Sequence, residues 1–321
     1  KMKPSSKSLP VVLTIAGSDS GGGAGIQADL KTFAALEVFG TSAITCVTAQ
    51  NPTQVSRVYA IDAHMVAEQI MMVCAGFSLS AAKTGMLYAE PIIRAVAQCV
   101  SQYRIPNLVV DPVMMSTSRA QLLRPDSVST LCWEIMTKAL VVTPNLVEAE
   151  VLFGSPIPNT EAAKAAARDI AERFKTACLV KGGHLKSEVG GRKSEVGSRP
   201  ASPLSPQATP RRGKSEVGCQ KLAPRRAGSE VGDKKSGKAS GRRSGGDVVD
   251  VLYWQGKILE FRCPRVDTTE THGTGCTHSA ALTAFLAKGD PLPKAIEKAQ
   301  RFVHDALKNA VAVGKHHTLG W

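Results

Sequence analysis

The run of small residues at positions 271–277, Thr-His-Gly-Thr-Gly-Cys-Thr, has the composition of an anion-binding turn. A helix is expected over residues 277–287 directly after it, so backbone N–H groups should converge at the positive end of a helix dipole. Gly273 and Gly275 let a phosphate approach this backbone closely. Cys276 shares the turn, and a thiol at a helix N-terminus is expected to have a lowered pKa. The alternative is an ordinary glycine-rich loop in which Cys276 only fills space.

Charged and amide side chains follow three further apolar runs. Asp111 follows residues 108–110, and Asn145 and Glu148 come shortly after residues 140–142. Carboxylate and amide oxygens at neighbouring strand ends suit Mg²⁺, which keeps several of its waters. Lys181 follows the third run, residues 178–180, and offers a cation for phosphate. The plain alternatives are that Asp111 shapes a turn before Pro112 and that Lys181 is a solvated loop charge.

Two more polar segments follow the first two apolar runs. Gln50 and Asn51 could hydrogen-bond the edge of a ring. The glycine-rich stretch 17–25 lacks the Gly-Lys-Ser/Thr of a Walker loop and matches a dinucleotide fingerprint only loosely. Taken with the anion-binding turn, these residues describe phosphoryl transfer, which needs charge neutralisation, positioning and a base near the acceptor hydroxyl.

Apolar runs alternate with helical patterns along the chain, which predicts a mostly parallel sheet covered on both faces. In such folds ligands bind at the carboxyl ends of the strands, where the polar residues above are expected. The predicted strands are residues 11–16, 42–49, 81–84, 108–110, 140–142 and 178–180, with a hairpin over 248–254 and 257–262. The predicted helices are residues 26–36, 65–77, 161–174, 277–287 and 293–311.

Residues 186–246 differ in kind from the rest of the chain. They hold 7 Lys and 8 Arg against 4 Glu and 1 Asp, which gives +10 of the net charge of +13. They contain no aromatic residue and repeat the pentapeptide Lys-Ser-Glu-Val-Gly. We expect a disordered low-complexity insertion in a surface loop, because this composition cannot bury enough apolar surface to offset chain entropy. A basic tether for acidic partners is the alternative.

The remaining composition sets limits on partners and compartment. The basic charge is local, so no nucleic-acid partner is expected. No apolar run reaches the roughly 18 residues of a membrane span, and residues 11–16 are too short for a signal peptide. The eight cysteines form no CxxC pair, which favours reduced thiols in the cytoplasm, with an organellar address left open. The domain organisation expected is a flexible N-terminus, residues 1–8, and one domain, residues 9–321, interrupted by 186–246.

Eight motifs occur together in a fixed order. They are Ala16–Ser20, Gly22–Phe33, Thr48–Asn51, Lys83–Leu87, Asp111–Met114, Thr143–Leu146, Lys181–His184 and His272–Thr277. In this set the chain resembles the hydroxymethylpyrimidine/phosphomethylpyrimidine kinases of thiamine biosynthesis, from about residue 9 to residue 313 outside the insertion. The resemblance implies a ribokinase-like three-layer α/β/α fold. It also implies ATP-dependent phosphorylation of 4-amino-5-hydroxymethyl-2-methylpyrimidine and then of its monophosphate, with ATP, Mg²⁺ and a homodimer expected.

The resemblance also assigns roles at matching positions. Cys276 stands at the place of the catalytic base, and Gly273, Thr274 and Gly275 resemble the anion hole. Gln50 resembles the residue that hydrogen-bonds the aminopyrimidine. The rest of that pocket is implied to be Gly17, Asp29, Met86 and Val113. The nucleotide and metal positions implied are Lys181, Asn145 and Glu148 for ATP, and Asp111 and Glu148 for Mg²⁺.

Departures from the family pattern keep two other functions open. Ser118-Arg119 stands where the family has Ser-Gly, Glu270 where Asn is usual, and His278 where an apolar residue is usual. The tail Val313–His317 is expected to be shorter than the glycine-rich ending of the family. The alternatives are a pyridoxal kinase of the same superfamily and a catalytically impaired binding protein.

Overall fold

A computed structural model describes most of the chain. The described residues are 8–115, 122–183, 246–268 and 272–321. Ser118, Arg119, His184 and Glu270 lie outside them, as do residues 1–7 and residues 186–245 of the expected insertion. No helix in the described ranges is both long and apolar enough to span a bilayer.

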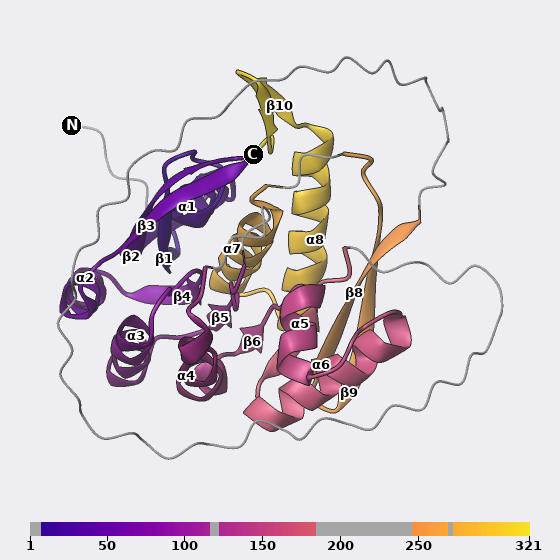
Figure 1. Cartoon of the computed structure of the whole chain (residues 1–321), viewed down its shortest axis with the longest axis horizontal. Coiled ribbons are helices and arrows are strands. Elements are labelled where there is room, and N and C mark those ends of the chain that lie inside the picture. Colours follow the sequence, from indigo (N-terminus) through magenta and orange to yellow (C-terminus); the bar gives the residue numbers. More distant parts are fainter. Residues whose placement is uncertain (1–7, 116–121, 184–245, 269–271) are drawn as a thin grey trace, which may run out of the picture. The chain divides into compact units, whose positions relative to one another are not determined.

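Nine strands in the described residues form one mixed sheet (Figure 1). Their order is β3-β2-β1-β4-β5-β6-β7-β8-β9. The strands from β2 to β7 in this order are parallel, and β3, β8 and β9 are antiparallel to their neighbours. The bounds are β1 Val11–Asp19, β2 Phe39–Asn51, β3 Gln54–Ala60, β4 Leu79–Thr84, β5 Leu108–Val110, β6 Val141–Val142, β7 Ala177–Val180, β8 Asp247–Trp254 and β9 Lys257–Pro264.

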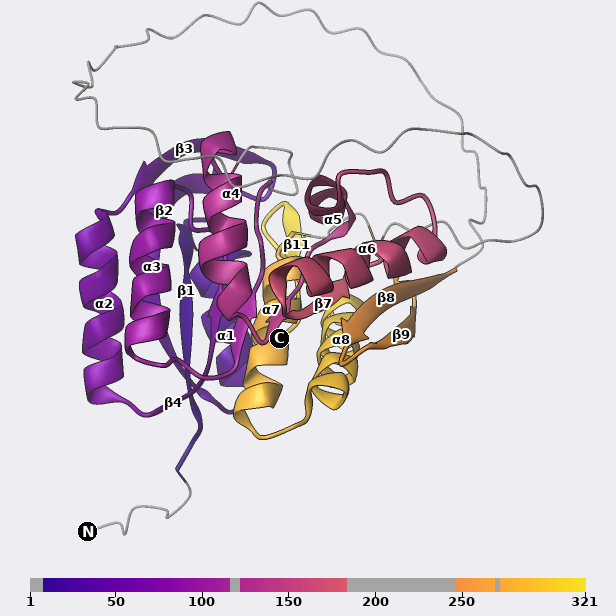
Figure 2. The ribbon, with the colours of Figure 1, turned by 90° about the horizontal axis from the view of Figure 1, so that it is seen from below.

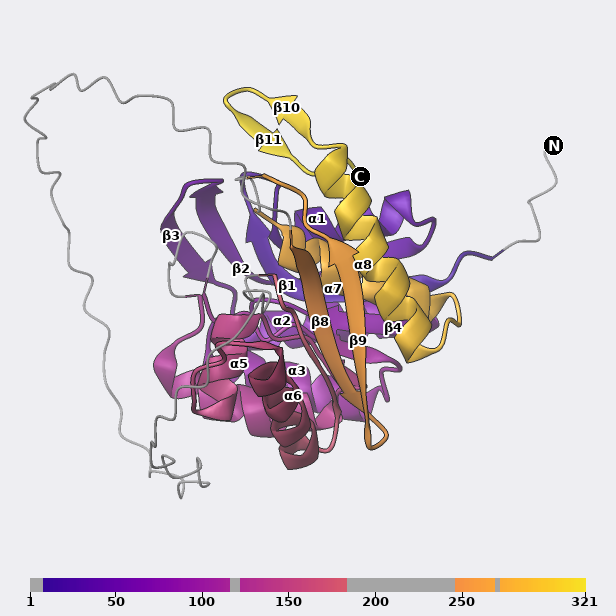
Figure 3. The ribbon, with the colours of Figure 1, turned by 90° about the vertical axis from the view of Figure 1, so that its right-hand side faces the viewer.

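Helices cover both faces of this sheet (Figure 2). One face carries α1 Gly25–Ala35, α7 Thr274–Ala287 and α8 Leu292–Lys308. The other carries α2 Ala63–Gly76, α3 Glu90–Gln102, the short α4 Val128–Thr130, α5 Leu146–Phe153 and α6 Thr160–Phe174. Figure 3 shows α8 beside the β8–β9 hairpin. The small hairpin of β10 Val311–Val313 and β11 His316–Thr318 lies beyond the end of α8. The described residues therefore form the predicted three-layer α/β/α arrangement.

Burial on both faces explains why the central strands are apolar throughout. On β5, Val109 packs in the core beneath α7 and α8, and Val110 packs in the core beneath α3 and α6. Val141 and Val142 of β6 divide in the same way. A strand buried on both sides needs an uninterrupted apolar run, not an alternating one.

Most of the predicted elements are confirmed, with shifted bounds. The β8–β9 hairpin turns between the two strands predicted for it, at Gln255 and Gly256, and both residues have positive φ. β2 is longer than expected and carries Gln50 within its last residues. The sequence analysis did not name β3, α3 or α5. β3 is an edge strand with mostly exposed side chains, so its pattern is weak.

The parallel strands bring their carboxyl ends to one edge of the sheet. Six strands end there in the order β2, β1, β4, β5, β6 and β7. The segments at their ends carry, in that order, Gln50, Asp19, Met86, Asp111, Asn145 and Lys181. The N-terminus of α7 reaches the same edge, where Ser279 contacts Asp111. The predicted site residues are therefore neighbours.

Candidate active site

The anion-binding turn is built around Gly273, the N-cap of α7. Its φ is +82°, and a Cβ added there would lie 1.8 Å from the carbonyl oxygen of Gly23. Only glycine meets both demands, because L residues rarely adopt this conformation and the added carbon would overlap another backbone. The turn is thus packed directly on the glycine-rich loop after β1. The N-terminus of a helix favours an anion, because its first amides lack partners within the helix and the helix dipole is positive there.

Asp19 ties the two loops together, a role that the sequence analysis missed. Its carboxylate accepts hydrogen bonds from the amides of Gly21, Gly23 and Ala24, at 2.8, 3.1 and 2.8 Å. It also lies 3.2 Å from Nε2 of His272, the residue before Gly273. Burial alone would raise the pKa of Asp19, but these hydrogen bonds lower it below its ordinary value. The loop after β1 and the start of α7 therefore form one unit.

Cys276 lies in the first turn of α7, and its thiol differs from expectation. Burial raises the pKa of Cys276 to about 11, and the charge of Lys83 and an amide hydrogen bond from Gly25 offset this only in part. The predicted lowering of this pKa is therefore wrong for the free protein. The helix dipole favours the thiolate, but removing the thiol from water costs more.

A buried ion pair lies beside Cys276. Lys83 of β4 donates from Nζ to Oδ1 of Asp29 on α1 at 2.8 Å, and neither side chain is exposed. Oδ2 of Asp29 accepts a 2.6 Å hydrogen bond from Thr14. Burial raises the pKa of Asp29, although Lys83 opposes the shift. Asp29, which we expected in the pyrimidine pocket, is thus engaged within the protein, and Lys83 is a site residue that the sequence analysis did not assign.

Asp111 joins three elements at the centre of the edge. Lys181 donates from Nζ to its Oδ1 at 2.9 Å, and Ser279 of α7 donates to its Oδ2 at 3.2 Å. The Lys181 side chain is 14% exposed. A Cβ added to Gly275 would lie 3.6 Å from its ammonium, so the cation borders the anion-binding turn. Burial would lower the pKa of Lys181, but Asp111 and Glu148 raise it above its ordinary value.

Glu148 and Asn145 form a capping box at the start of α5. Asn145 accepts from the Glu148 amide at 3.0 Å, and Glu148 accepts from the amides of Asn145 and Met114 at 2.9 and 3.3 Å. Burial raises the pKa of Glu148 to about 7, with the charge of Lys181 opposing and that of Asp111 assisting. The carboxamide oxygen of Asn145 is used by the helix cap.

The carboxylates fit Mg²⁺ only as partial ligands. No group of three or more His, Cys, Asp or Glu residues in the described part of the chain is arranged to hold a metal ion. The charges of Asp111 and of the Lys181 ammonium both act on the Glu148 carboxyl group. One or two carboxylates suit an ion that keeps its waters and takes further oxygens from a nucleotide. Mg²⁺ would be held at Asp111 and Glu148 in that way.

A small apolar cluster borders Gly17 at the ends of β1 and β2. Cys46, Met86 and Leu122 form it, with Val113 packed against it. A Cβ on Gly17 would lie 2.7 Å from Sγ of Cys46 and 3.4 Å from Sδ of Met86, so glycine allows these side chains to pack directly against the β1 backbone. The expected pocket residues Gly17, Met86 and Val113 are therefore together.

Gln50 is fixed at the end of β2 by two neighbours. The hydroxyl of Thr48 donates to its carboxamide oxygen at 3.1 Å. Ser20, in the loop after β1, donates from Oγ to the backbone carbonyl of Gln50 at 2.7 Å and accepts from the backbone amide of Gln50 at 2.8 Å. Ser20 therefore fixes the backbone of Gln50, and Thr48 orients its carboxamide.

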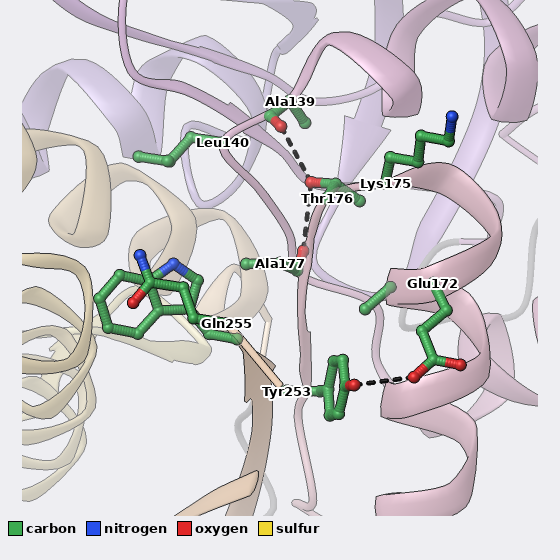
Figure 4. Close-up of a pocket in the computed structure, with 10 residues that line it drawn as sticks. Ala139, Leu140, Glu172, Lys175, Thr176, Ala177, Tyr253 and Gln255 are labelled. Carbon is green, nitrogen blue, oxygen red and sulfur yellow. Dashed lines mark hydrogen bonds between the residues drawn. The ribbon is translucent and has the colours of Figure 1, made fainter. Parts of the chain in front are cut away.

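A separate surface pocket lies at the opposite end of the strands (Figure 4). It is lined by Ala139 and Leu140, just before β6, and by Thr176 and Ala177 at the start of β7. Its polar contacts are internal, with Thr176 donating to the Ala139 carbonyl at 2.9 Å. None of the predicted site residues lines it, so we do not assign the reaction there.

Comparisons with known proteins agree with this geometry. The family described as phosphomethylpyrimidine kinase matches residues 19–196 and 235–320. The hydroxymethylpyrimidine/phosphomethylpyrimidine kinase of Bacillus subtilis is 34% identical over 310 residues, 97% of this chain and 93% of that protein. The stretch between the two matched segments, 197–234, lies inside the expected insertion.

Solved structures give the same result. The phosphomethylpyrimidine kinase of Clostridium difficile superposes with a TM-score of 0.67 and 29% identity, covering 93% of this chain and 99% of that one. The Staphylococcus aureus pyridoxal kinase in complex with AMP-PCP and pyridoxal gives a TM-score of 0.73 and 27% identity, with 98% and 94% covered. With its sheet, its glycine-capped α7 and these matches together, the chain belongs to the phosphomethylpyrimidine kinase family of ribokinase-like phosphotransferases.

Proposed function

We propose that this chain transfers the γ-phosphoryl group of ATP to 4-amino-5-hydroxymethyl-2-methylpyrimidine and then phosphorylates the resulting monophosphate. The observation that carries the proposal is the junction of Gly273, Cys276 and Lys181. An anion-binding turn, a thiol and a cation at the strand-end edge that also carries Gln50 and Met86 support this reaction. The relatives named hydroxymethylpyrimidine/phosphomethylpyrimidine kinase support this substrate class.

The pocket residues suit an aminopyrimidine. Gln50 offers a carboxamide that can pair with a ring nitrogen and an exocyclic amine, and a buried pair of this kind discriminates against rings that lack those groups. Met86 and Val113 supply apolar surface for the ring faces. Glycine at position 17 lets the β1 backbone approach this apolar cluster closely, because a Cβ there would lie 2.7 Å from Sγ of Cys46.

The phosphate end of the reaction is served by Lys181 and the start of α7. Lys181 balances charge on the transferred group, and the α7 amides bind its oxygens at the positive end of the helix dipole. The Asp111 carboxylate links Lys181 to α7, because it accepts hydrogen bonds from the Lys181 ammonium and from the Ser279 hydroxyl. Bound Mg²⁺ would neutralise further charge on the nucleotide phosphates.

Cys276 is proposed to take the proton from the hydroxymethyl group. The thiol must be ionised to do so, and a pKa of about 11 leaves few thiolates at neutral pH in the free protein. Lys83 is the buried cation that favours the thiolate. Because the folded pKa lies above neutrality, turnover limited by this step should rise as pH increases from 6 to 9.

A second candidate function, pyridoxal phosphorylation, is favoured by the structural match to a pyridoxal kinase bound to pyridoxal. Competition separates the two. With Mg²⁺ and ATP, equal concentrations of the pyrimidine alcohol and pyridoxal should give mainly pyrimidine phosphate if Gln50 reads the aminopyrimidine. Mainly pyridoxal phosphate would support the second function, and ATP consumption with neither ring would contradict both.

We also propose a homodimer formed through β2, β3 and α2. Val47 and Tyr59 face each other across β2 and β3 and are 45% and 72% exposed. Met65 and Met72 of α2, which packs on β2, are 50% and 66% exposed. Apolar patches of this kind on neighbouring elements mark interaction surfaces. Tyr59→Glu with Met72→Glu should halve the mass measured by light scattering, and an unchanged mass would contradict this interface.

The single domain and the cytoplasmic location remain predictions.

A further inference from the structure

His278 is a buried imidazole with unused hydrogen-bonding groups. It lies two residues after Cys276 on α7 and is 5% exposed. Within the described ranges neither Nδ1 nor Nε2 has a hydrogen-bond partner. Buried polar side chains are nearly always paired, and an exception calls for an explanation such as a missing water or ligand.

His278 lies on the side of α7 that faces β6 and β7. Leu282, one turn further along α7, packs in the core with Val141 of β6 and Leu179 of β7. Residues four apart lie on the same side of a helix, so His278 is on this side, one turn nearer the carboxyl ends of the strands. Lys181 follows directly after β7 there, and its charge acts on the imidazole. The charge of Asp111 acts on it as well.

The chemistry of the ring suits an uncharged polar group. Burial, followed by the positive charge of Lys181, lowers the pKa of His278 to about 3, so the ring is neutral at physiological pH. A neutral imidazole offers one donor and one acceptor. It adds no charge for phosphates, which Lys181 already provides, but it matches a hydroxyl, the edge of a base, or a water held between them.

We propose that His278 is a specificity-determining residue of the nucleotide site, where its imidazole gains a hydrogen-bond partner from the base or ribose of the bound nucleotide, directly or through one ordered water. This inference rests on the proposed ATP-dependent function. Among the described residues the imidazole is unpaired in the free protein, and it is proposed to be paired in the nucleotide complex. Loss of the imidazole should therefore stabilise the free protein and lower its affinity for the nucleotide.

The test uses the full-length protein and two variants, His278→Leu and His278→Gln. The first has an apolar side chain, and the second keeps an amide donor and acceptor. Leu should raise the Tm of the free protein by about 2 °C or more, since an unpaired buried polar group is removed. It should weaken ADP binding in calorimetry by about five- to tenfold, the range expected for one lost hydrogen bond. Gln should retain more ADP affinity than Leu, and pyrimidine affinity should stay within twofold in both.

The outcomes separate the inference from the proposed function. Wild-type ADP affinity in His278→Leu would overturn the inference and leave the kinase proposal intact. Equal losses for ADP and the pyrimidine, with a lower Tm, would show a packing role and would also overturn it. A wild-type protein that binds no ADP in the presence of Mg²⁺ would contradict the proposed function and the inference with it.

Discussion

Replacing Lys83 by methionine should expose the energetics of the buried ion pair. Methionine is unbranched and close in length to lysine, so it fills the space but carries no charge. The Asp29 carboxylate then loses its partner at 2.8 Å in a fully buried position and, among the described residues, keeps the hydrogen bond from Thr14. Removing one member of a buried pair costs about 3–5 kcal/mol when the other stays charged.

Asp29 can avoid part of this cost by taking up a proton. Its pKa is already raised by burial with Lys83 present, and it should rise further in Lys83→Met. A folded pKa above the unfolded value gives stability that is present at low pH and is lost as pH rises through the folded pKa. The loss in Lys83→Met should therefore be larger at pH 8 than at pH 5.5, by about 1.4 kcal/mol for each pH unit of this interval that lies below the folded pKa of Asp29.

Urea unfolding at the two pH values measures this difference. The matched control is Lys83→Met with Asp29→Asn, which keeps an acceptor for Thr14 and removes the buried charge. The double variant should regain most of the stability and lose the added pH dependence. It should still turn over slowly, because the cation beside Cys276 is gone. A double variant as unstable as the single one, or a loss independent of pH, would refute the ion-pair reasoning.

Four further predictions concern the site and the insertion. Cys276→Ala should lower kcat by about 10²–10⁴ while pyrimidine binding stays within a few-fold, and near-normal turnover would make the thiol a space-filler. Gln50→Leu should weaken pyrimidine binding by about 1–3 kcal/mol in calorimetry with ADP binding unchanged, whereas equal losses would indicate a folding defect. Burial raises the pKa of Glu148 from 4.5 to about 7, so Glu148 should make the stability of the wild-type protein fall as pH rises from 4.5 to 7. Urea unfolding of Glu148→Gln should lack this fall in stability, and the same pH profile in both proteins would contradict the role of Glu148. Replacing residues 186–246 by a short Gly/Ser loop should preserve activity and the KM for ATP, and a large rise in that KM would assign the basic segment to the nucleotide.

The contacts around the predicted insertion fit the last prediction. β7 and β8 are antiparallel neighbours, with Val180 paired to Val251. The amide of Gly182 donates to Oδ1 of Asp250 at 2.8 Å. The segments on either side of the predicted insertion are therefore adjacent, so a short loop can join them.

The sequence predicts the architecture well because the central strands are buried on both faces. Their apolar runs have no competing interpretation once helices alternate with them. The edge strand β3 was not predicted because most of its side chains face solvent and its period is weak. In α3, Ile92, Val96 and Val100 have clear helical spacing, so this helix could have been named from the sequence.

The site was predicted in part, and the misses have a common cause. Motifs at strand ends locate Asp111, Lys181 and Gln50 because topology alone brings strand ends together. The pairing of Lys83 with Asp29 joins residues 54 positions apart, and no local pattern shows it. A lysine inside a short apolar strand is the available signal, since such a charge is almost never buried without a partner. The pKa of Cys276 depends on burial, which the helix-terminus argument does not include.

Product identification tests the central claim most directly. Wild-type protein and Cys276→Ala are incubated with Mg²⁺, ATP and 4-amino-5-hydroxymethyl-2-methylpyrimidine, and the phosphorus NMR spectrum is followed over time. We expect the wild-type protein to form a pyrimidine monophosphate and to convert it to the diphosphate, and the variant to form almost none of either. No pyrimidine phosphate from the wild-type protein, or equal amounts from both proteins, would contradict phosphoryl transfer to this alcohol with Cys276 as the base.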